Sequence, residues 1–256
     1  MLLKSPLRIK AGDPLPDWRF EVVEPINGPA ITIVGDRQPN GIGAFIDKIQ
    51  LECNWLSAGI VFEWIDNAVV EPVKVHRSNG TAVSVQSCRQ SLFRSIQVTE
   101  AVEASSAVEV TCFRETQGDS TNACRFDFVS VYACNASRLL TVRGNQVRGL
   151  GTSRNLQFGL VFLHPTWEKQ LDKLPQAERQ RYFAEDITQI MLFMSNVEDV
   201  GFDRLKITAG YQSMAYMIGP WVDRVTMVGQ ALVYDANQVN QKAGADTSKL
   251  AVVVRR

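Results

Sequence analysis

The sequence predicts a mainly β protein whose strands form a jelly roll or β-sandwich, arranged as one sandwich or as two. About six to eight short segments of alternating apolar and polar residues follow one another over residues 31–134, at roughly ten-residue spacing. Asn79-Gly80 separates two of these segments, and this dipeptide is typical of a tight hairpin because a type I′ turn needs positive φ at both central residues. Convincing helical periodicity is confined to residues 165–185. The pattern therefore favours a sandwich with a short helical insertion over alternating strands and helices.

Residues 1–30 are expected to form an extended arm. Proline removes a backbone donor and fixes φ, and this stretch holds five of the ten prolines: Pro6, Pro14, Pro16, Pro25 and Pro29. Its apolar anchor is the run from Trp18 to Phe20. Such an arm either stays poorly ordered or packs on a neighbouring subunit, where it would contribute to assembly and not to folding of the main body.

Residues 31–134 make up the predicted sandwich. Within Gly59–Ile65, the side chains of Ile60, Phe62 and Trp64 share one face, while apolar residues also occur on the other. Both faces of this strand are therefore expected to be at least partly covered, as in two packed sheets.

Residues 135–157 are expected to form an arginine- and glycine-rich loop or crossover. Gly144, Gly149 and Gly151 interrupt any regular element there, and the composition changes sharply. The segment is a natural subdomain boundary.

Residues 158–256 form a second β-rich part that contains the helical insertion at 165–185. Pro165 suits a first helical turn, and Trp167, Leu171 and Leu174 follow helical spacing. Strands are expected to resume over residues 187–195, 204–208, 214–218, 222–235 and 249–254.

Two further observations concern the regularity of the chain. Gly229, in the middle of the strand predicted at 222–235, indicates a bulge or a close backbone approach. No repeat with a period of 20–50 residues is visible, so the sequence does not predict a repeat architecture.

Composition excludes several classes of protein. The chain of 256 residues is 45% hydrophobic and carries 27 Lys+Arg against 27 Asp+Glu, so it is neither a generally basic nucleic-acid binder nor a polyanionic disordered chain. No apolar run reaches the ~18 residues of a membrane span. The first residues lack the features of a signal peptide, and we expect synthesis in a cytoplasm with all five cysteines reduced.

The sequence carries no recognisable catalytic, cofactor or metal motif, and it predicts no enzyme activity. There is no CxxC, and neither His76 nor His164 has a neighbouring partner of metal-ligand spacing. The acidic pairs at 185–186 and 198–199 bracket a strand, whose ends lie roughly 25 Å apart, too far for a glycosidase pair. Trp55 is the best exposed candidate for stacking on a sugar.

Charge is distributed unevenly along the chain, which suits self-association. Residues 128–167 carry four arginines and no acid, whereas residues 95–120 are acidic. The candidate interaction residues are these arginines and the anchor of the arm: Arg138, Arg143, Arg148, Arg154, Trp18 and Phe20. Their expected partners are acids of a neighbouring copy: Glu100, Glu103, Glu109 and Glu115. No aromatic residue lies among the arginines over residues 135–157, so nucleic-acid binding is not expected.

The stretch GIGAFIDKIQLECNWLSAGIVFEWIDNAVVEPVKVHRSNGTAVSVQS, residues 41–87, resembles a pattern common in structural proteins of tailed bacteriophages. Jelly-roll proteins of phage capsids and their cement or decoration subunits have this kind of sequence. The resemblance implies a non-enzymatic virion protein, made in the host cytoplasm, that binds other virion proteins and forms a homo-oligomer such as a trimer. The alternatives are a carbohydrate-binding β-sandwich and a phage tail or connector component.

Overall fold

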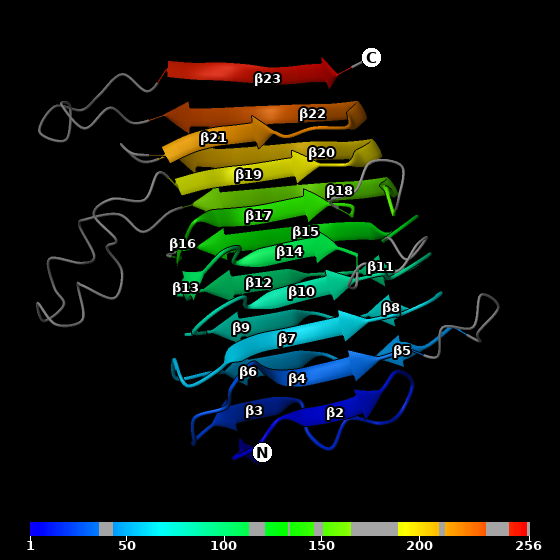
Figure 1. Ribbon diagram of the computed structural model, residues 1–256, viewed down its shortest axis with the longest axis vertical. Coiled ribbons are helices and arrows are strands. Elements are labelled where there is room, and N and C mark those ends of the chain that lie inside the picture. Colours follow the sequence, from blue (N-terminus) through cyan, green and yellow to red (C-terminus); the bar gives the residue numbers. More distant parts are fainter. Residues whose placement is uncertain are drawn as a thin grey trace, which may run out of the picture.

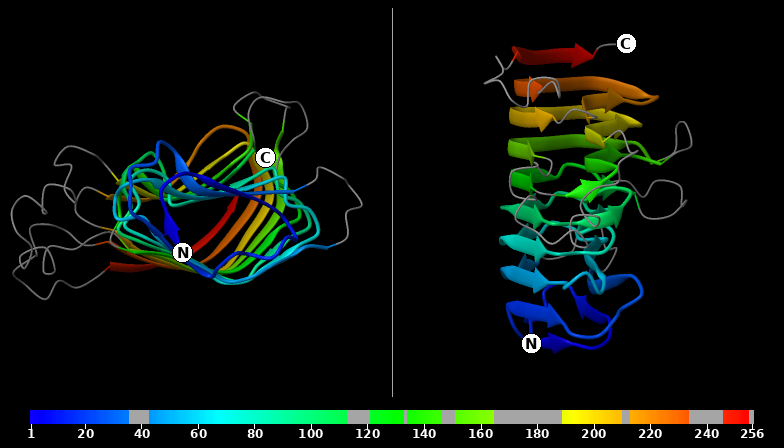
Figure 2. Two further views of the ribbon diagram at one scale, coloured as in Figure 1. Left: turned by 90° about the horizontal axis from the view of Figure 1, so that it is seen from below. Right: turned by 90° about the vertical axis from the view of Figure 1, so that its left-hand side faces the viewer.

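The chain winds into a parallel β-helix, in which successive coils add strands to two facing sheets (Figure 1). The computed structural model describes residues 1–35, 43–112, 121–132, 134–145, 151–164, 189–209, 213–233 and 246–254. The N-terminus lies at one end of the stack and the last strand at the other (Figures 1 and 2).

Sheet A is the longer of the two sheets. Its order is β1 (Leu2–Leu3), β3 (Arg19–Val22), β6 (Ile49–Glu52), β9 (Val73–His76), β12 (Ile96–Thr99), β15 (Arg125–Tyr132), β18 (Ser153–His164), β20 (Val197–Ala209), β22 (Val222–Val233) and β23 (Asp246–Val254). Three short strands form a flank of this sheet and join it at β15: β5 (Phe45–Ile46), β8 (Val69–Val70) and β11 (Leu92–Phe93). All these pairs are parallel except β22 with β23, which is antiparallel.

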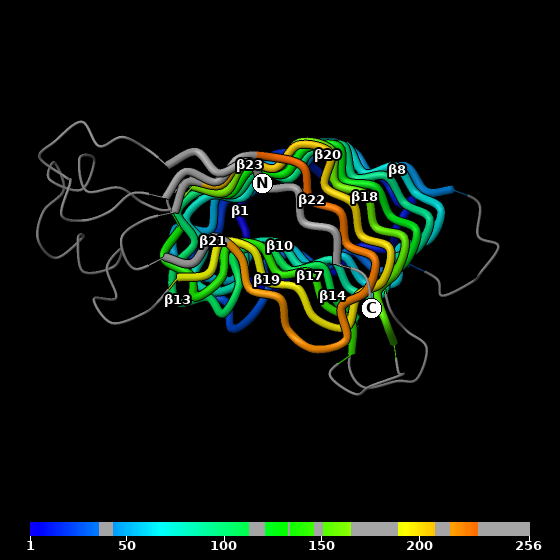
Figure 3. Tube along the Cα trace, turned by 90° about the horizontal axis from the view of Figure 1, so that it is seen from above, coloured from blue at the N-terminus to red at the C-terminus, as the bar shows by residue number. Residues whose placement is uncertain are grey.

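Sheet B lies opposite sheet A, and the two enclose the core (Figure 3). Its order is β2 (Leu7–Lys10), β4 (Pro29–Val34), β7 (Ala58–Glu63), β10 (Val83–Gln86), β14 (Val108–Thr111), β17 (Arg138–Arg143), β19 (Gln189–Ser195) and β21 (Ser213–Ile218), all parallel. A small parallel pair is formed by β13 (Val102–Ala104) and β16 (Asn135–Ala136). Each of these strands belongs to a connection that leads from sheet A to sheet B.

The prediction of a mainly β chain is confirmed, but the strands do not have the antiparallel pairing of a jelly roll or sandwich. Asn79-Gly80 connects β9 in sheet A to β10 in sheet B, so it turns between sheets and makes no hairpin. Alternation shows which face of a strand is buried, and it carries no information about which strand is its neighbour. The helical insertion predicted at 165–185 lies outside the described residues.

Residues 1–30, expected to form an arm, contribute strands to both sheets. Strands β1 and β3 begin sheet A, and β2 and β4 begin sheet B. The prolines fall in the connections, apart from Pro29 at the first position of β4, where a missing donor is tolerated. Phe20, which alternates with exposed residues in β3, is only 3% exposed. Both sheets also continue through the predicted boundaries at 134 and 157.

Six of the described turns between the sheets share one backbone feature. Each has four residues, and its first and last residues have positive φ. On the corner from sheet B to sheet A, called the first corner, the turns are Trp64–Asn67, Ser87–Gln90, Asn196–Asp199 and Trp221–Arg224. On the opposite, second corner they are Arg77–Gly80 and Glu100–Glu103. Ser87 follows Trp64 by 23 residues, and Glu100 follows Arg77 by the same interval.

This structural repeat was not visible in the sequence. The turn positions with positive φ are occupied by Trp, Ser, Arg, Glu and Asn among others. Glycine, which adopts positive φ most easily, would have made these turns recognisable in the sequence. The prediction for Gly229 is confirmed, since a Cβ atom there would lie 1.9 Å from the carbonyl oxygen of Leu205, next to a shift in the pairing of β20 with β22.

Four phenylalanines stack through the core on consecutive rungs of sheet A. Phe93, Phe126, Phe158 and Phe202 are register partners in neighbouring strands, with ring centroids 5.0, 4.7 and 4.7 Å apart and nearly parallel planes. Phe62 packs edge-on against Phe93 from sheet B, at 5.5 Å. Parallel strands are spaced about 4.8 Å apart, which matches the distance at which offset aromatic rings stack.

We expect Phe126→Ala to lower the free energy of unfolding by about 3–5 kcal/mol, because it opens a cavity in the middle of this stack. Phe45→Ala is the matched control, since Phe45 is 57% exposed, and it should cost about 0.5 kcal/mol or less. Urea unfolding followed by circular dichroism measures both. Similar midpoints for the two variants would show that the stack contributes little.

Candidate functional site

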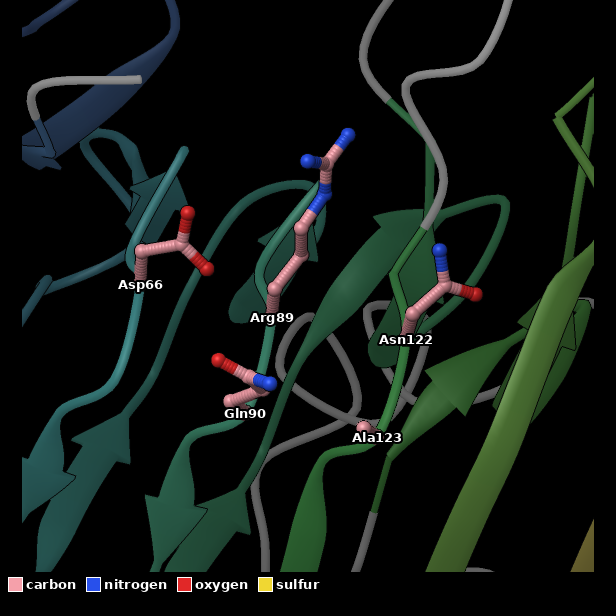
Figure 4. A pocket seen from close by; sticks show the side chains of 5 residues that line it. All are labelled: Asp66, Arg89, Gln90, Asn122 and Ala123. Carbon is pink, nitrogen blue, oxygen red and sulfur yellow. The ribbon is translucent and has the colours of Figure 1, made fainter. Parts of the chain in front are cut away.

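A row of polar side chains runs along the first corner. Asp66, Arg89, Asn122 and Arg154 occupy equivalent positions on successive coils and are joined by isolated parallel bridges. With Gln90 and Ala123, the first three line an open pocket of about 250 Å³ (Figure 4). The coil geometry therefore brings together residues that are 23 or more positions apart in the sequence.

The pocket contains side chains of both positive and negative charge. Burial raises the pKa of Asp66, and the positive charge of Arg89 lowers it by less, so the pKa stays above its ordinary value. The side-chain oxygen of Asn122 accepts a hydrogen bond of 2.9 Å from the backbone N–H of Arg154. Such a surface can hold a small polar group through hydrogen bonds and charge.

The row continues beyond the pocket as a network of ion pairs. Arg154 Nε lies 2.9 Å from Glu198 Oε2, and Arg224 contacts Glu198, Asp199 and Asp223. The acidic pair at 198–199 is thus held by arginines on neighbouring coils, as part of the corner.

A second pocket, of about 260 Å³, lies on the second corner. It is lined by Asn54, Trp55, Leu56, Asn79, Val102 and Glu103. Trp55, expected to be an exposed platform for sugars, is half-buried, and the guanidinium of Arg77 lies 5.2 Å from its ring centroid. Its ring is therefore not an open face.

The predicted arginine element is divided between sheet B and the first corner. Arg138 and Arg143 lie at the two ends of β17, and Arg154 lies in β18, while Arg148 is outside the described residues. The guanidinium of Arg138 covers the ring of Phe193 at 4.1 Å. The segment expected to be a loop is largely strand, so its arginines point from different parts of the surface.

Arg143 has its partner within the same chain. Its Nη2 lies 2.7 Å from Oε1 of Glu109, which stands on the preceding strand of sheet B. From the sequence, Glu109 is expected to pair with an arginine of a neighbouring copy. Parallel pairing of β14 with β17 places Glu109 and Arg143 side by side within one molecule.

The anchor of the predicted arm also divides into two roles. Trp18 is 38% exposed, and its ring is flanked by the guanidinium of Arg19 at 4.1 Å and the ammonium of Lys48 at 4.5 Å. Phe20 belongs to the core. Of these two aromatic residues, only Trp18 lies at the surface.

One polar cluster on the outer face of sheet A was missed by sequence reasoning. Glu52 and His76 are register partners, with Oε2 and Nδ1 2.9 Å apart, and Arg77 Nη2 lies 2.9 Å from the same oxygen. Burial by itself raises the pKa of Glu52, but the hydrogen bonds from Arg77 and His76 outweigh it, and the pKa is lowered. His164 packs against Tyr132, with ring centroids 5.0 Å apart.

All five cysteines are free, and every one except the half-buried Cys112 is buried. Burial raises the pKa of Cys53, Cys124 and Cys134 to about 12, and it also raises the pKa values of Cys88 and Cys112. Since the thiolate is the reactive form, these groups act as small apolar side chains.

Within the described residues, no group of three or more His, Cys, Asp and Glu side chains is arranged to hold a metal ion. That part of the chain also contains no helix of the length and apolar character needed to cross a membrane. Comparisons with protein-family models, with curated proteins and with solved structures gave no match to this chain.

We expect Glu52→Gln to destabilise the protein at pH 7 and to matter progressively less as the pH falls below 4.5. A carboxylate whose pKa is lowered on folding stabilises the native state above its ordinary pKa of 4.5, and this contribution disappears as the group is protonated. Thermal unfolding of both proteins between pH 3 and pH 7 measures the difference. Glu24→Gln, on an exposed pair with Lys4, is the control, and an effect of Glu52→Gln that does not depend on pH would contradict the prediction.

We expect a thiol reagent to modify at most one cysteine per native chain at neutral pH, and all five after denaturation. Cys112 is the only half-buried thiol, and the other four are at most 1% exposed. Titration with a chromogenic disulfide measures the count, and Cys112→Ser should remove the fast reaction. Two or more fast thiols in the native protein would show that the coils open readily.

Proposed function

We propose that the protein is a non-enzymatic structural subunit that works by self-association in the virion of a tailed bacteriophage. The observation that supports a structural role most directly is the unbroken stack of Phe93, Phe126, Phe158 and Phe202 through consecutive rungs. Side chains held in register through a closely packed core resist bending, because moving one rung disturbs the packing of its neighbours.

The charged and reactive side chains support the same proposal. Arg143 pairs with Glu109, Arg154 with Glu198, and His76 with Glu52, each across neighbouring coils. Four of the five cysteines are buried as apolar groups. These residues hold the coils together, which is what a scaffold requires.

Among the virion roles, a tail or connector component fits this geometry better than a shell or cement subunit. The jelly roll implied by the resemblance has antiparallel strands, whereas these coils stack in parallel along one axis (Figures 1 and 2). A stack of coils spans distance along its axis, and a rod that links two parts of a particle uses this property.

Carbohydrate binding is the second candidate. The two corner pockets, with Asp66, Arg89 and Asn122 in one and Asn54 and Trp55 in the other, offer polar groups that could contact hydroxyls. They are small and open, so we expect any such binding to be weak.

We expect the purified protein to form oligomers that light scattering detects at concentrations of tens of micromolar, and that electron microscopy shows with a uniform shape. Sedimentation velocity over a hundredfold range of concentration tests this. A chain that stays monomeric over the whole range would overturn the proposal. A glycan array distinguishes the carbohydrate alternative, because a monomer that binds one glycan class would favour it.

A further inference from the structure

The outer face of sheet A changes character along the stack of coils. One row of register partners runs straight up this face, and its members are Gln50, Lys74, Gln97, Ser130, Phe162 and Lys206. The first four side chains are polar, as expected for a sheet face in water. At β18 the row has an aromatic member, Phe162, and at β20 it is charged again, at Lys206.

Phe162 is surrounded by further apolar and aromatic side chains on β15 and β18, which we call the aromatic patch. Its members are Phe128, Tyr132, Leu160, Phe162 and His164. Phe128 and Phe162 meet edge-on with centroids 6.0 Å apart, and Tyr132 packs against His164 at 5.0 Å. Tyr132 is 37% exposed and the other members are half-buried, with the ammonium of Lys206 5.3 Å from the ring centroid of Phe162. Apolar side chains that gather at the surface and stay partly exposed are typical of an interaction surface.

We infer that the aromatic patch is the surface through which two copies of this chain pack face to face, with a two-fold axis running along β18. This inference rests on the proposed function and names the partner and the surface that self-association uses. In such an arrangement β18 faces β18 of the other copy, and each β20 faces the other copy's β15.

The charges around the patch select this axis. Arg204 and Lys206 project outward from β20, at the register positions next to Leu160 and Phe162. With the axis along β18, Arg204 lies over Phe128 of the other copy, beside the ion pair in which Arg125 Nε and Asp127 Oδ1 are 2.7 Å apart. An arginine over an aromatic ring, with a carboxylate beside it, is a favourable site. With the axis along the stack instead, Arg204 of each copy would meet Lys206 of the other, and like charges would repel.

The size of the face predicts how tightly the copies bind. The aromatic patch occupies only β15 and β18, so the two copies bury a small apolar area. Stable complexes begin at about 1,200 Å², so we expect reversible association and not a permanent dimer.

The test is sedimentation equilibrium of the wild-type chain and of a double variant, Leu160→Gln with Phe162→Gln. Glutamine already occupies the row of Phe162 at Gln97, and Arg204 occupies the row of Leu160, so polar side chains are compatible with the fold at both rows. Phe193→Gln, on sheet B, is the matched control for a half-buried outward phenylalanine. Unchanged circular dichroism and thermal midpoints confirm that each variant is folded.

We expect the double variant to associate at least about tenfold more weakly than wild type, while Phe193→Gln associates like wild type. If the wild type and the double variant associate equally, the aromatic patch is not the contact surface, and the proposed structural function is unaffected. A wild type that stays monomeric would overturn both.

Reversing one charge tests the orientation of the axis. We expect Arg204→Glu to weaken association, because the new carboxylate would face Phe128 and Asp127 of the other copy. Stronger association would show that the axis runs along the stack, where the same change would relieve repulsion between Arg204 and Lys206, and it would overturn the proposed arrangement.

Discussion

The whole structure depends on the parallel register of its strands. Each residue lies about 4.8 Å from its equivalent on the next coil, and at this distance like side chains are direct neighbours. Inside, this produces the stack from Phe93 to Phe202. Outside, it produces ion pairs such as Arg143 with Glu109, and rows such as the one that ends in Phe162 and Lys206. Core and surface are therefore set by the same spacing.

The corners depend on the sheets that flank them. Residues such as Trp64, Ser87 and Arg77 hold positive φ without being glycine, and this conformation costs roughly 1–2 kcal/mol for each of them. Short turns with that cost do not form alone, and the packed rungs on either side impose their geometry. A loss of core packing should consequently loosen the corners, and with them the polar row from Asp66 to Arg154.

The sequence indicated where strands lie and which side chains face inward, as with Ile96 and Val98, because alternation reports burial directly. It could not indicate parallel pairing, since the same alternation serves either direction. The sequence shows no regular period for the coils. Different residue types occupy the turn positions with positive φ, and the coils differ in length. For the same reason the candidate site was incomplete: Asp66, Arg89 and Asn122 are neighbours only once the coils are stacked.

The equal interval between the turns at Trp64 and Ser87 has a consequence for how such a molecule varies. A coil enters and leaves at the same corner with the same backbone conformation, so it is a self-contained module. Gain or loss of one module changes the length of the rod by about 4.8 Å and leaves both flanking coils in register. The length of the rod can therefore change during evolution by whole coils, while the two sheets keep their register.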